Sequence, residues 1–81
     1  MKVDVLGTGC PKCTLLYDRV AQAAREANLE LELGKISDIE RIMEYAVMAT
    51  PALVIDGRVR LSGRVPAVEE LKNLLESVSN S

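Results

Sequence analysis

The 81-residue sequence contains no histidine, no phenylalanine and no tryptophan, and it has only two tyrosines. Because histidine is absent, any mechanism that needs an imidazole base or an imidazole metal ligand is excluded. Aromatic residues are scarce while 48% of the residues are hydrophobic, so the core must consist of aliphatic side chains. We therefore expect one globular domain, residues 1–81, with a small core of leucine, isoleucine, valine and methionine.

The sequence also lacks a large charge of one sign and a long apolar run. The net charge is −2, which provides no basic surface for a phosphate backbone, so no nucleic-acid partner is expected. The longest apolar run, residues 45–49, is too short to cross a bilayer, and no membrane association is expected. Asp4 interrupts the apolar stretch that a signal peptide needs, which favours a cytoplasmic protein unless a leader precedes this sequence. The expected state is a monomer.

The hydrophobic pattern predicts seven elements in the order β-α-β-α-β-β-α. The expected strands cover residues 2–6, 29–33, 52–55 and 58–61, and the expected helices cover residues 11–27, 39–46 and 66–78. Ser37 and Glu40 have the spacing of a capping box for the short second helix. The tight-turn pair Asp56-Gly57 predicts that the last two strands form an antiparallel hairpin.

This order of elements predicts an α/β fold. Helices separate the first three strands, so these strands are expected to pair through right-handed crossovers, whereas the last pair must be antiparallel. The result is a four-stranded mixed sheet with helices on both faces and with the first strand inside the sheet. The carboxyl end of that first strand then lies next to the most unusual residues of the chain.

Two cysteines, Cys10 and Cys13, stand where the first strand ends and the first helix begins. As a structural bridge they would contribute only about 2 kcal/mol, because the ring that they close is so short. A helix N-terminus offers unpaired N–H groups and about half a positive charge, both of which stabilise a thiolate. The position therefore favours a redox-active pair, with Cys10 as the nucleophile and Cys13, one turn into the helix, as the resolving cysteine.

The neighbours of the cysteines allow more than one interpretation. Pro11 suits the first helical turn, where a missing N–H leaves nothing unpaired, and Lys12 either adds positive charge beside the thiols or is an ordinary solvated lysine. A Cys-x-x-Cys pair also occurs in zinc sites, but zinc needs four ligands and this chain offers two cysteines and no histidine. We expect no metal and no cofactor other than the Cys10–Cys13 disulfide. The alternative function is a dithiol module that binds a soft metal ion or arsenite.

Three segments of the chain resemble the thioredoxin superfamily, and within it the small, glutaredoxin-sized redox-active disulfide proteins of bacteria and archaea. They are residues 7–13 (GTGCPKC), 49–57 (ATPALVIDG) and 62–66 (SGRVP), so the resemblance extends over nearly the whole chain. It implies a thioredoxin-like fold and a thiol–disulfide oxidoreductase that reduces protein disulfides by dithiol exchange through Cys10 and Cys13.

The resemblance also implies a binding site for the substrate chain. In the superfamily the proline of the Thr-Pro segment is cis and faces the cysteines, and Pro51 matches it; a trans proline that begins a strand is the alternative. The backbone of Thr50 would then pair with an extended substrate segment, and Gly63 would let its loop approach the cysteines. Asp4 has the spacing of the buried proton acceptor of thioredoxins, six residues before Cys10, but its place in the polar phase of the strand favours a solvated aspartate.

Two departures from the superfamily bear on the partner. Gly9 replaces the tryptophan that precedes the cysteines in ordinary thioredoxins, and residues 62–65 lack the acidic residues with which glutaredoxins hold the α-amino group of glutathione. The loss of one or two charge-assisted hydrogen bonds would weaken glutathione recognition by about 2–5 kcal/mol. We therefore expect a thioredoxin-reductase-type flavoprotein as the electron donor and disulfide-containing proteins as substrates.

Overall fold

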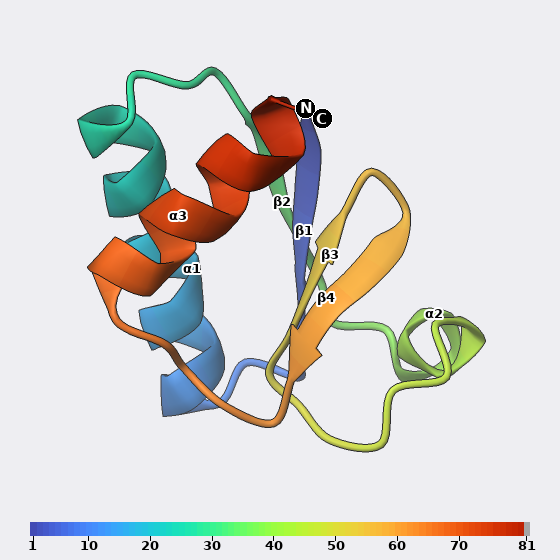
Figure 1. The fold of residues 1–81 in the computed structure, drawn as a ribbon. Helices are drawn as coiled ribbons and strands as arrows, with labels where there is room; N and C mark the ends of the chain where they lie inside the picture. Colours follow the sequence, from blue (N-terminus) through green and yellow to red (C-terminus); the bar gives the residue numbers. More distant parts are fainter. Residues whose placement is uncertain (81) are drawn as a thin grey trace.

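A computed structural model describes residues 1–80 of the protein. Seven elements follow one another in the order that the sequence predicts (Figure 1). They are β1 (Lys2–Leu6), α1 (Pro11–Glu26), β2 (Glu32–Ile36), α2 (Ile39–Glu44), β3 (Ala52–Ile55), β4 (Arg58–Ser62) and α3 (Val68–Ser79). The β3–β4 turn at Asp56 and Gly57 lies at the end of the sheet where β1 begins, because the Asp56 N–H donates to the Lys2 carbonyl at 2.8 Å.

The strands form one mixed sheet in the order β2-β1-β3-β4, with β1 in the interior as expected. β1 and β2 are parallel, β3 is antiparallel to β1 with Ala52 opposite Leu6, and β4 is antiparallel to β3. The predicted crossover to a parallel β3 is therefore wrong. The short helix α2, of six residues, packs against Leu6 and Ile36 at the end of the sheet where β2 finishes instead of running back along β2. β3 therefore starts at that end and runs back from there.

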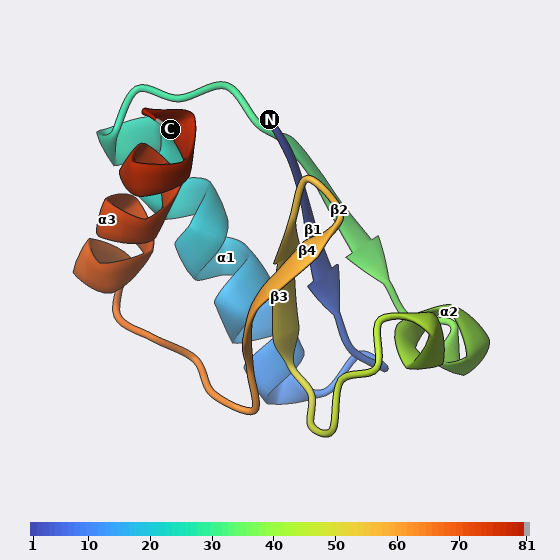
Figure 2. The same ribbon diagram turned by 45° about the vertical axis from the view of Figure 1, so that its right-hand side comes forward.

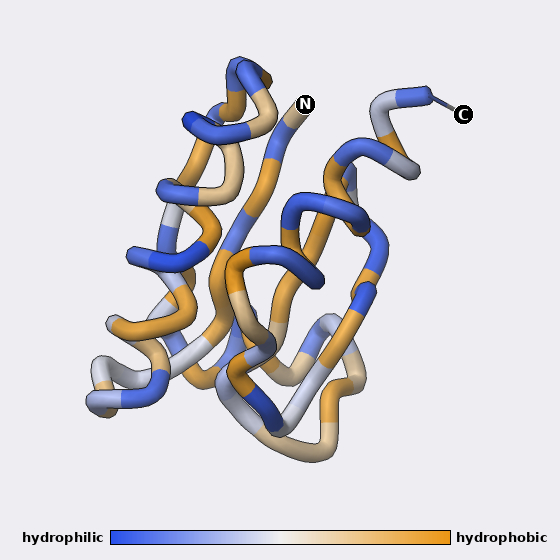
Figure 3. Tube along the Cα trace, turned by 60° about the vertical axis from the view of Figure 1, so that its left-hand side comes forward, coloured by the Kyte–Doolittle hydropathy of each residue, from blue (hydrophilic) through white to orange (hydrophobic). Residues whose placement is uncertain are grey.

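Helices cover both faces of the sheet, as predicted. α1 and α3 pack side by side on one face, and α2 lies against the other face near one end of the sheet (Figures 1 and 2). The larger cluster of buried residues lies under α1 and α3 and includes Val3, Val5, Leu16, Val20, Leu53, Ile55, Leu71 and Leu75. The smaller cluster lies under α2 and comprises Leu6, Ile36, Ile42, Ala52 and Val54. Figure 3 shows the matching alternation of hydrophobic and hydrophilic positions along the helices.

The second strand begins later than its alternating leucines predict. Leu29, Leu31 and Leu33 do pack against the larger cluster, so the alternation correctly reports which side chains are half-buried. The ladder itself starts at Glu32, whose N–H donates to the Met1 carbonyl at 2.9 Å. A strand can only pair where its neighbour exists, and the start of β1 therefore sets the start of β2.

The second helix has a different N-cap from the predicted one, and the third helix begins later than predicted. Asp38, not Ser37, is the N-cap of α2, and its side chain accepts a hydrogen bond from the Glu40 N–H at 3.0 Å. The predicted capping box is thus wrong, because the residue next to the helix caps it instead. α3 begins at Val68, after Ala67, which has an extended backbone and no side-chain cap.

Candidate redox site

Cys10 and Cys13 form a disulfide at the N-terminus of α1. Cys10 is the N-cap: its carbonyl accepts hydrogen bonds from the N–H groups of Cys13 and Thr14 at 3.0 and 3.1 Å. The Cys10 Sγ also accepts from the Cys13 N–H at 3.2 Å. Sulfur here occupies the position of the oxygen that caps most helices. A thiolate at Cys10 would accept the same bond more strongly than a thiol.

The two sulfurs differ in their access to solvent. Cys13 is only 6% exposed, whereas Cys10 is half-buried and lies beside Pro11 and Lys12, which are both exposed. Pro11 occupies the first turn of α1 as predicted. A protein disulfide can therefore approach Cys10 from solvent much more readily than Cys13.

Gly7 contacts the buried sulfur, a feature that sequence reasoning missed. A Cβ atom added at Gly7 would lie 2.2 Å from the Cys13 Sγ and 2.9 Å from the Cys13 Cβ. Gly7 continues the sheet by one residue, since its N–H donates to the Ile36 carbonyl at 3.0 Å. A glycine at the end of a strand can mark a close approach, but the sequence did not indicate what approaches it.

Thr50 and Pro51 lie at the same end of the sheet as the disulfide. The Thr50–Pro51 peptide bond is cis, Pro51 is buried and Thr50 is exposed. The β1–β3 register pairs Leu6 with Ala52, so its continuation by one residue brings Pro51 opposite Gly7. Since Gly7 contacts Cys13, the sheet itself brings the Thr-Pro segment close to the cysteines.

Gly63 joins the loop after β4 to this segment. Its φ is +80°, and its N–H donates to the Pro51 carbonyl at 2.8 Å. From the other side, the Arg19 guanidinium of α1 donates to the carbonyls of Val65 and Pro66 at 3.4 and 3.0 Å. The loop is thus fixed both to the helix that bears the cysteines and to the segment that begins β3.

Asp4 is half-buried, neither fully solvated nor enclosed. Strand alternation puts it on the same face as Leu6, the face covered by α2, and not on the face of Val5. A Cβ atom added at Gly34 of β2 would lie 2.9 Å from the Asp4 Oδ1. A role for Asp4 in proton transfer stays a prediction.

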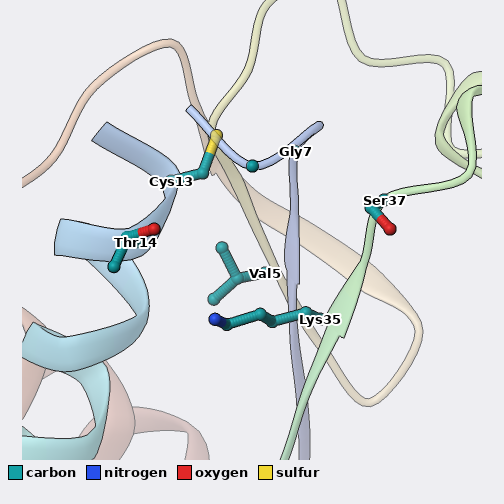
Figure 4. A pocket seen from close by; sticks show the side chains of 7 residues that line it. Val5, Gly7, Cys13, Thr14, Lys35 and Ser37 are labelled. Atoms are coloured by element: carbon teal, nitrogen blue, oxygen red, sulfur yellow. The ribbon is translucent and has the colours of Figure 1, made fainter. Parts of the chain in front are cut away.

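A cavity of about 190 Å³ lies beside Cys13, between the start of α1 and the end of β2. Its lining includes Val5 and Gly7 from β1 and the segment after it, and Lys35 and Ser37 from β2 and its end. Figure 4 shows the Lys35 side chain extending from β2 toward α1. The Lys35 Nζ lies 4.5 Å from the centroid of the Tyr17 ring. Only the β2 register, which the sequence does not provide, places Lys35 here.

Two features are absent from the part of the chain that the structure describes. Among residues 1–80, no group of three or more histidine, cysteine, aspartate or glutamate side chains is arranged to hold a metal ion. In the same residues, no helix has both the length and the apolar character needed to cross a membrane.

Comparison with known proteins gives one consistent answer. Residues 1–76 match the family model described as a thioredoxin domain. A thioredoxin of Methanothermobacter thermautotrophicus is 36% identical over 75 residues, which cover 93% of this chain and 97% of that protein. A thioredoxin of Methanocaldococcus jannaschii is 37% identical over 75 residues, with coverages of 93% and 86%. The solved structure of thioredoxin 1 from Thermosipho africanus aligns over the whole of both chains with a TM-score of 0.65 at 18% identity, which confirms the expected fold.

Proposed function

The chain belongs to the thioredoxin family and is a thiol–disulfide oxidoreductase, and on that premise we propose that it is a small electron carrier that reduces protein disulfides through Cys10 and Cys13. The Cys10 thiolate attacks a substrate disulfide, releases one substrate thiolate and forms a mixed disulfide. Cys13 then attacks the Cys10 Sγ, which releases the second substrate thiolate and closes the Cys10–Cys13 disulfide. Two electrons have then passed to the substrate, and a reductase restores the dithiol.

The division of roles between the cysteines rests on one observation. The Cys10 Sγ is the acceptor at the N-cap of α1, while Cys13 is 6% exposed. The N-cap position stabilises negative charge on Cys10, and the burial of Cys13 keeps external disulfides away from the resolving thiol. Lys12, exposed between the two, adds positive charge near the thiolate.

Trapping experiments test these roles. The Cys13→Ser variant should accumulate a mixed disulfide with a protein substrate through Cys10, and the matched Cys10→Ser variant should not. Rapid alkylation of the reduced protein at neutral pH, followed by peptide mapping, should label Cys10 well before Cys13. The assignment is wrong if Cys13 is labelled first.

The proposed docking site for the substrate chain is the backbone of Thr50, with Pro51 and Gly63 as its supports. Thr50 is exposed at the end of the sheet that holds the disulfide, and the Gly63 N–H holds the Pro51 carbonyl at 2.8 Å. An extended segment of a substrate can add to such an edge through main-chain hydrogen bonds. These contacts would help a protein substrate and would not be available to a small disulfide.

The Gly63→Ala variant tests this docking site. Its φ of +80° is unfavourable for alanine, and the new Cβ would lie 3.2 Å from the Ala49 Cβ, so the loop must shift. The variant should raise the KM for a protein disulfide and leave the rate with hydroxyethyl disulfide unchanged. Equal losses with both substrates would contradict the docking role.

Family members transfer electrons between reductase partners and disulfide substrates, and the proposed donor here is a thioredoxin-reductase-type flavoprotein. Residues 62–65 provide no carboxylate for the glutathione amino group. Insulin reduction should therefore be faster with NADPH and the cognate flavoprotein than with NADPH, glutathione and glutathione reductase. Faster turnover through glutathione would make the protein a glutaredoxin. The proposal includes a monomeric protein that works in the cytoplasm, where thiols are kept reduced.

One sample distinguishes the carrier from the alternative dithiol module. The protein is purified anaerobically, and its thiols and bound metals are measured together. Two titratable thiols without metal fit the carrier, whereas stoichiometric metal or arsenic fits the binding module.

A further inference from the structure

The cavity between α1 and β2 reaches to within one residue of the nucleophile, because Gly9, which precedes Cys10, belongs to its lining. It lies at the carboxyl ends of the neighbouring parallel strands β1 and β2. After β1 the chain turns to α1 on one face of the sheet, and after β2 it turns to α2 on the other face (Figures 1 and 2). A crevice opens where such connections leave toward opposite faces, and open α/β sheets bind ligands there. The topology thus leaves a site beside Cys10 on the β2 side, away from Thr50 on the β3 side.

The lining of this cavity is polar on one side and carries a positive charge. Lys35 supplies an ammonium group, Thr14 and Ser37 supply hydroxyls, and none of the residues within 1–80 that line the cavity is acidic (Figure 4). The contact of Lys35 with the Tyr17 ring, at 4.5 Å, holds the ammonium toward α1 without neutralising it. No ion pair within residues 1–80 joins Lys35 to a carboxylate. Its charge is therefore available to an anionic group of another molecule.

The size of the cavity suits a single side chain. Its volume of about 190 Å³ corresponds to roughly six water molecules at about 30 Å³ each. The side chain of a glutamate or an aspartate fits into this space, whereas a whole segment of a protein does not. Val5 gives the methylene groups of such a side chain an apolar contact, and Gly7 and Gly9 contribute no side chain that would fill the cavity.

A substrate chain that docks at Thr50 passes the cavity after a few residues. Neighbouring strands lie about 4.8 Å apart, so β3 and β2, on the two sides of β1, are about 10 Å apart. An extended chain advances about 3.3 Å per residue and covers this distance with about three residues. When one flank of the substrate pairs with Thr50 and its cysteine meets Cys10, the other flank therefore reaches the cavity.

We propose that this cavity is a specificity site for an acidic side chain of the substrate protein, a glutamate or an aspartate within about three residues of the reactive cysteine. The carboxylate lies at the Lys35 ammonium and accepts hydrogen bonds from the hydroxyls of Thr14 and Ser37. Only the flank of the substrate that points away from Thr50 places a side chain there. The inference rests on the proposed function and names a class of its substrates, disulfides with an acidic residue on one flank; the exchange steps at the two cysteines are unchanged.

A set of matched peptides tests the proposal. Each peptide has a single cysteine, activated as a mixed disulfide with a 2-thiopyridyl group, and carries glutamate or glutamine at the second position before the cysteine or at the second position after it. The reduced protein attacks the peptide sulfur, and the absorbance of the released thiopyridone gives the rate constant.

The measured quantity is the coupling between Lys35 and the peptide carboxylate. The rate constant of each glutamate peptide is divided by that of its glutamine partner, and this ratio for the wild type is divided by the same ratio for Lys35→Gln. Any effect of the substitution on the thiols themselves then cancels. The coupling should be about two- to five-fold on one flank of the cysteine and close to unity on the other, and it should fall with added salt.

Two matched variants decide which lysine is responsible. Lys12→Gln removes an equal charge beside the same disulfide and should keep the preference for glutamate on one flank, and Lys35→Arg should also keep it. A coupling of unity on both flanks, an equal coupling on both flanks, or a preference that disappears with Lys12→Gln would each overturn the proposal. In all three cases the peptides still react at Cys10, so the proposed function stands. It fails instead, and this inference with it, if Cys13→Ser forms a mixed disulfide with none of the peptides.

Discussion

Replacing Gly7 by alanine should make the disulfide easier to reduce. The new Cβ would lie 2.2 Å from the Cys13 Sγ, about 1.3 Å inside an ordinary contact distance of roughly 3.5 Å. In the reduced protein the Cys13 side chain can turn away, but in the oxidised protein its sulfur is bonded to Cys10 and cannot. Overpacking typically destabilises a core by about 1–3 kcal/mol. If the oxidised form alone bears this strain, the reduction potential rises by about 20–65 mV, since 30 mV corresponds to about 1.4 kcal/mol.

The assay is equilibration with a series of dithiothreitol redox buffers, followed by alkylation and mass spectrometry. Gly57→Ala is the control: no atom lies within 4 Å of its added Cβ, although its φ of +85° strains the backbone of an alanine, and it lies in the β3–β4 turn at the far end of the sheet. It should lower the stability of both redox forms equally and leave the potential unchanged. An unchanged potential in Gly7→Ala, with both forms equally destabilised, would refute the argument that Gly7 accommodates the bonded sulfur.

Three further predictions concern stability. Arg19→Ala removes two hydrogen bonds to the loop before α3 and should lower the free energy of unfolding in urea by about 1–3 kcal/mol; an unchanged free energy of unfolding would contradict this contribution. Asp38→Ala removes the N-cap of α2 and should lower stability by about 0.5–2 kcal/mol, with faster amide exchange confined to α2. The pKa of Glu70 is lowered, chiefly by the hydrogen bond from Arg64, so this pair stabilises the fold at neutral pH and its contribution is lost as pH falls through the folded-state pKa. Urea midpoints at about pH 7 and pH 3 should therefore differ slightly less in Glu70→Gln than in the wild type.

The local part of the redox site could be predicted from the sequence. Whether a thiol stands at a helix N-cap depends on neighbouring residues only, here a strand that ends at Leu6 and a proline at the start of α1. The order of the elements and the interior position of β1 follow from the hydrophobic pattern in the same way. These features need no knowledge of what lies on the next strand.

The main features that the sequence did not reveal are contacts between different elements. The direction of β3 depends on the path of the connection after β2, and the pattern gives the residues of that connection but not its path. The same is true of the register that puts Lys35 beside the cavity and of the approach of Gly7 to Cys13. The leucine alternation before β2 correctly predicted which side chains are half-buried, but not where the strand pairs with β1. The side chains pack against the core, whereas the hydrogen bonds depend on where β1 begins.

The interior position of β1 gives the disulfide different surroundings on its two sides. The carboxyl end of β1 has β3 on one side and β2 on the other, and Gly7, immediately after β1, contacts Cys13. On the β3 side lie Thr50 and the loop held by Gly63, which suit an extended protein segment directed at Cys10. On the β2 side lies the cavity lined by Lys35 and Cys13. Substitutions on the β3 side should therefore impair the reduction of protein substrates more than the reduction of small disulfides, which have no extended segment to dock.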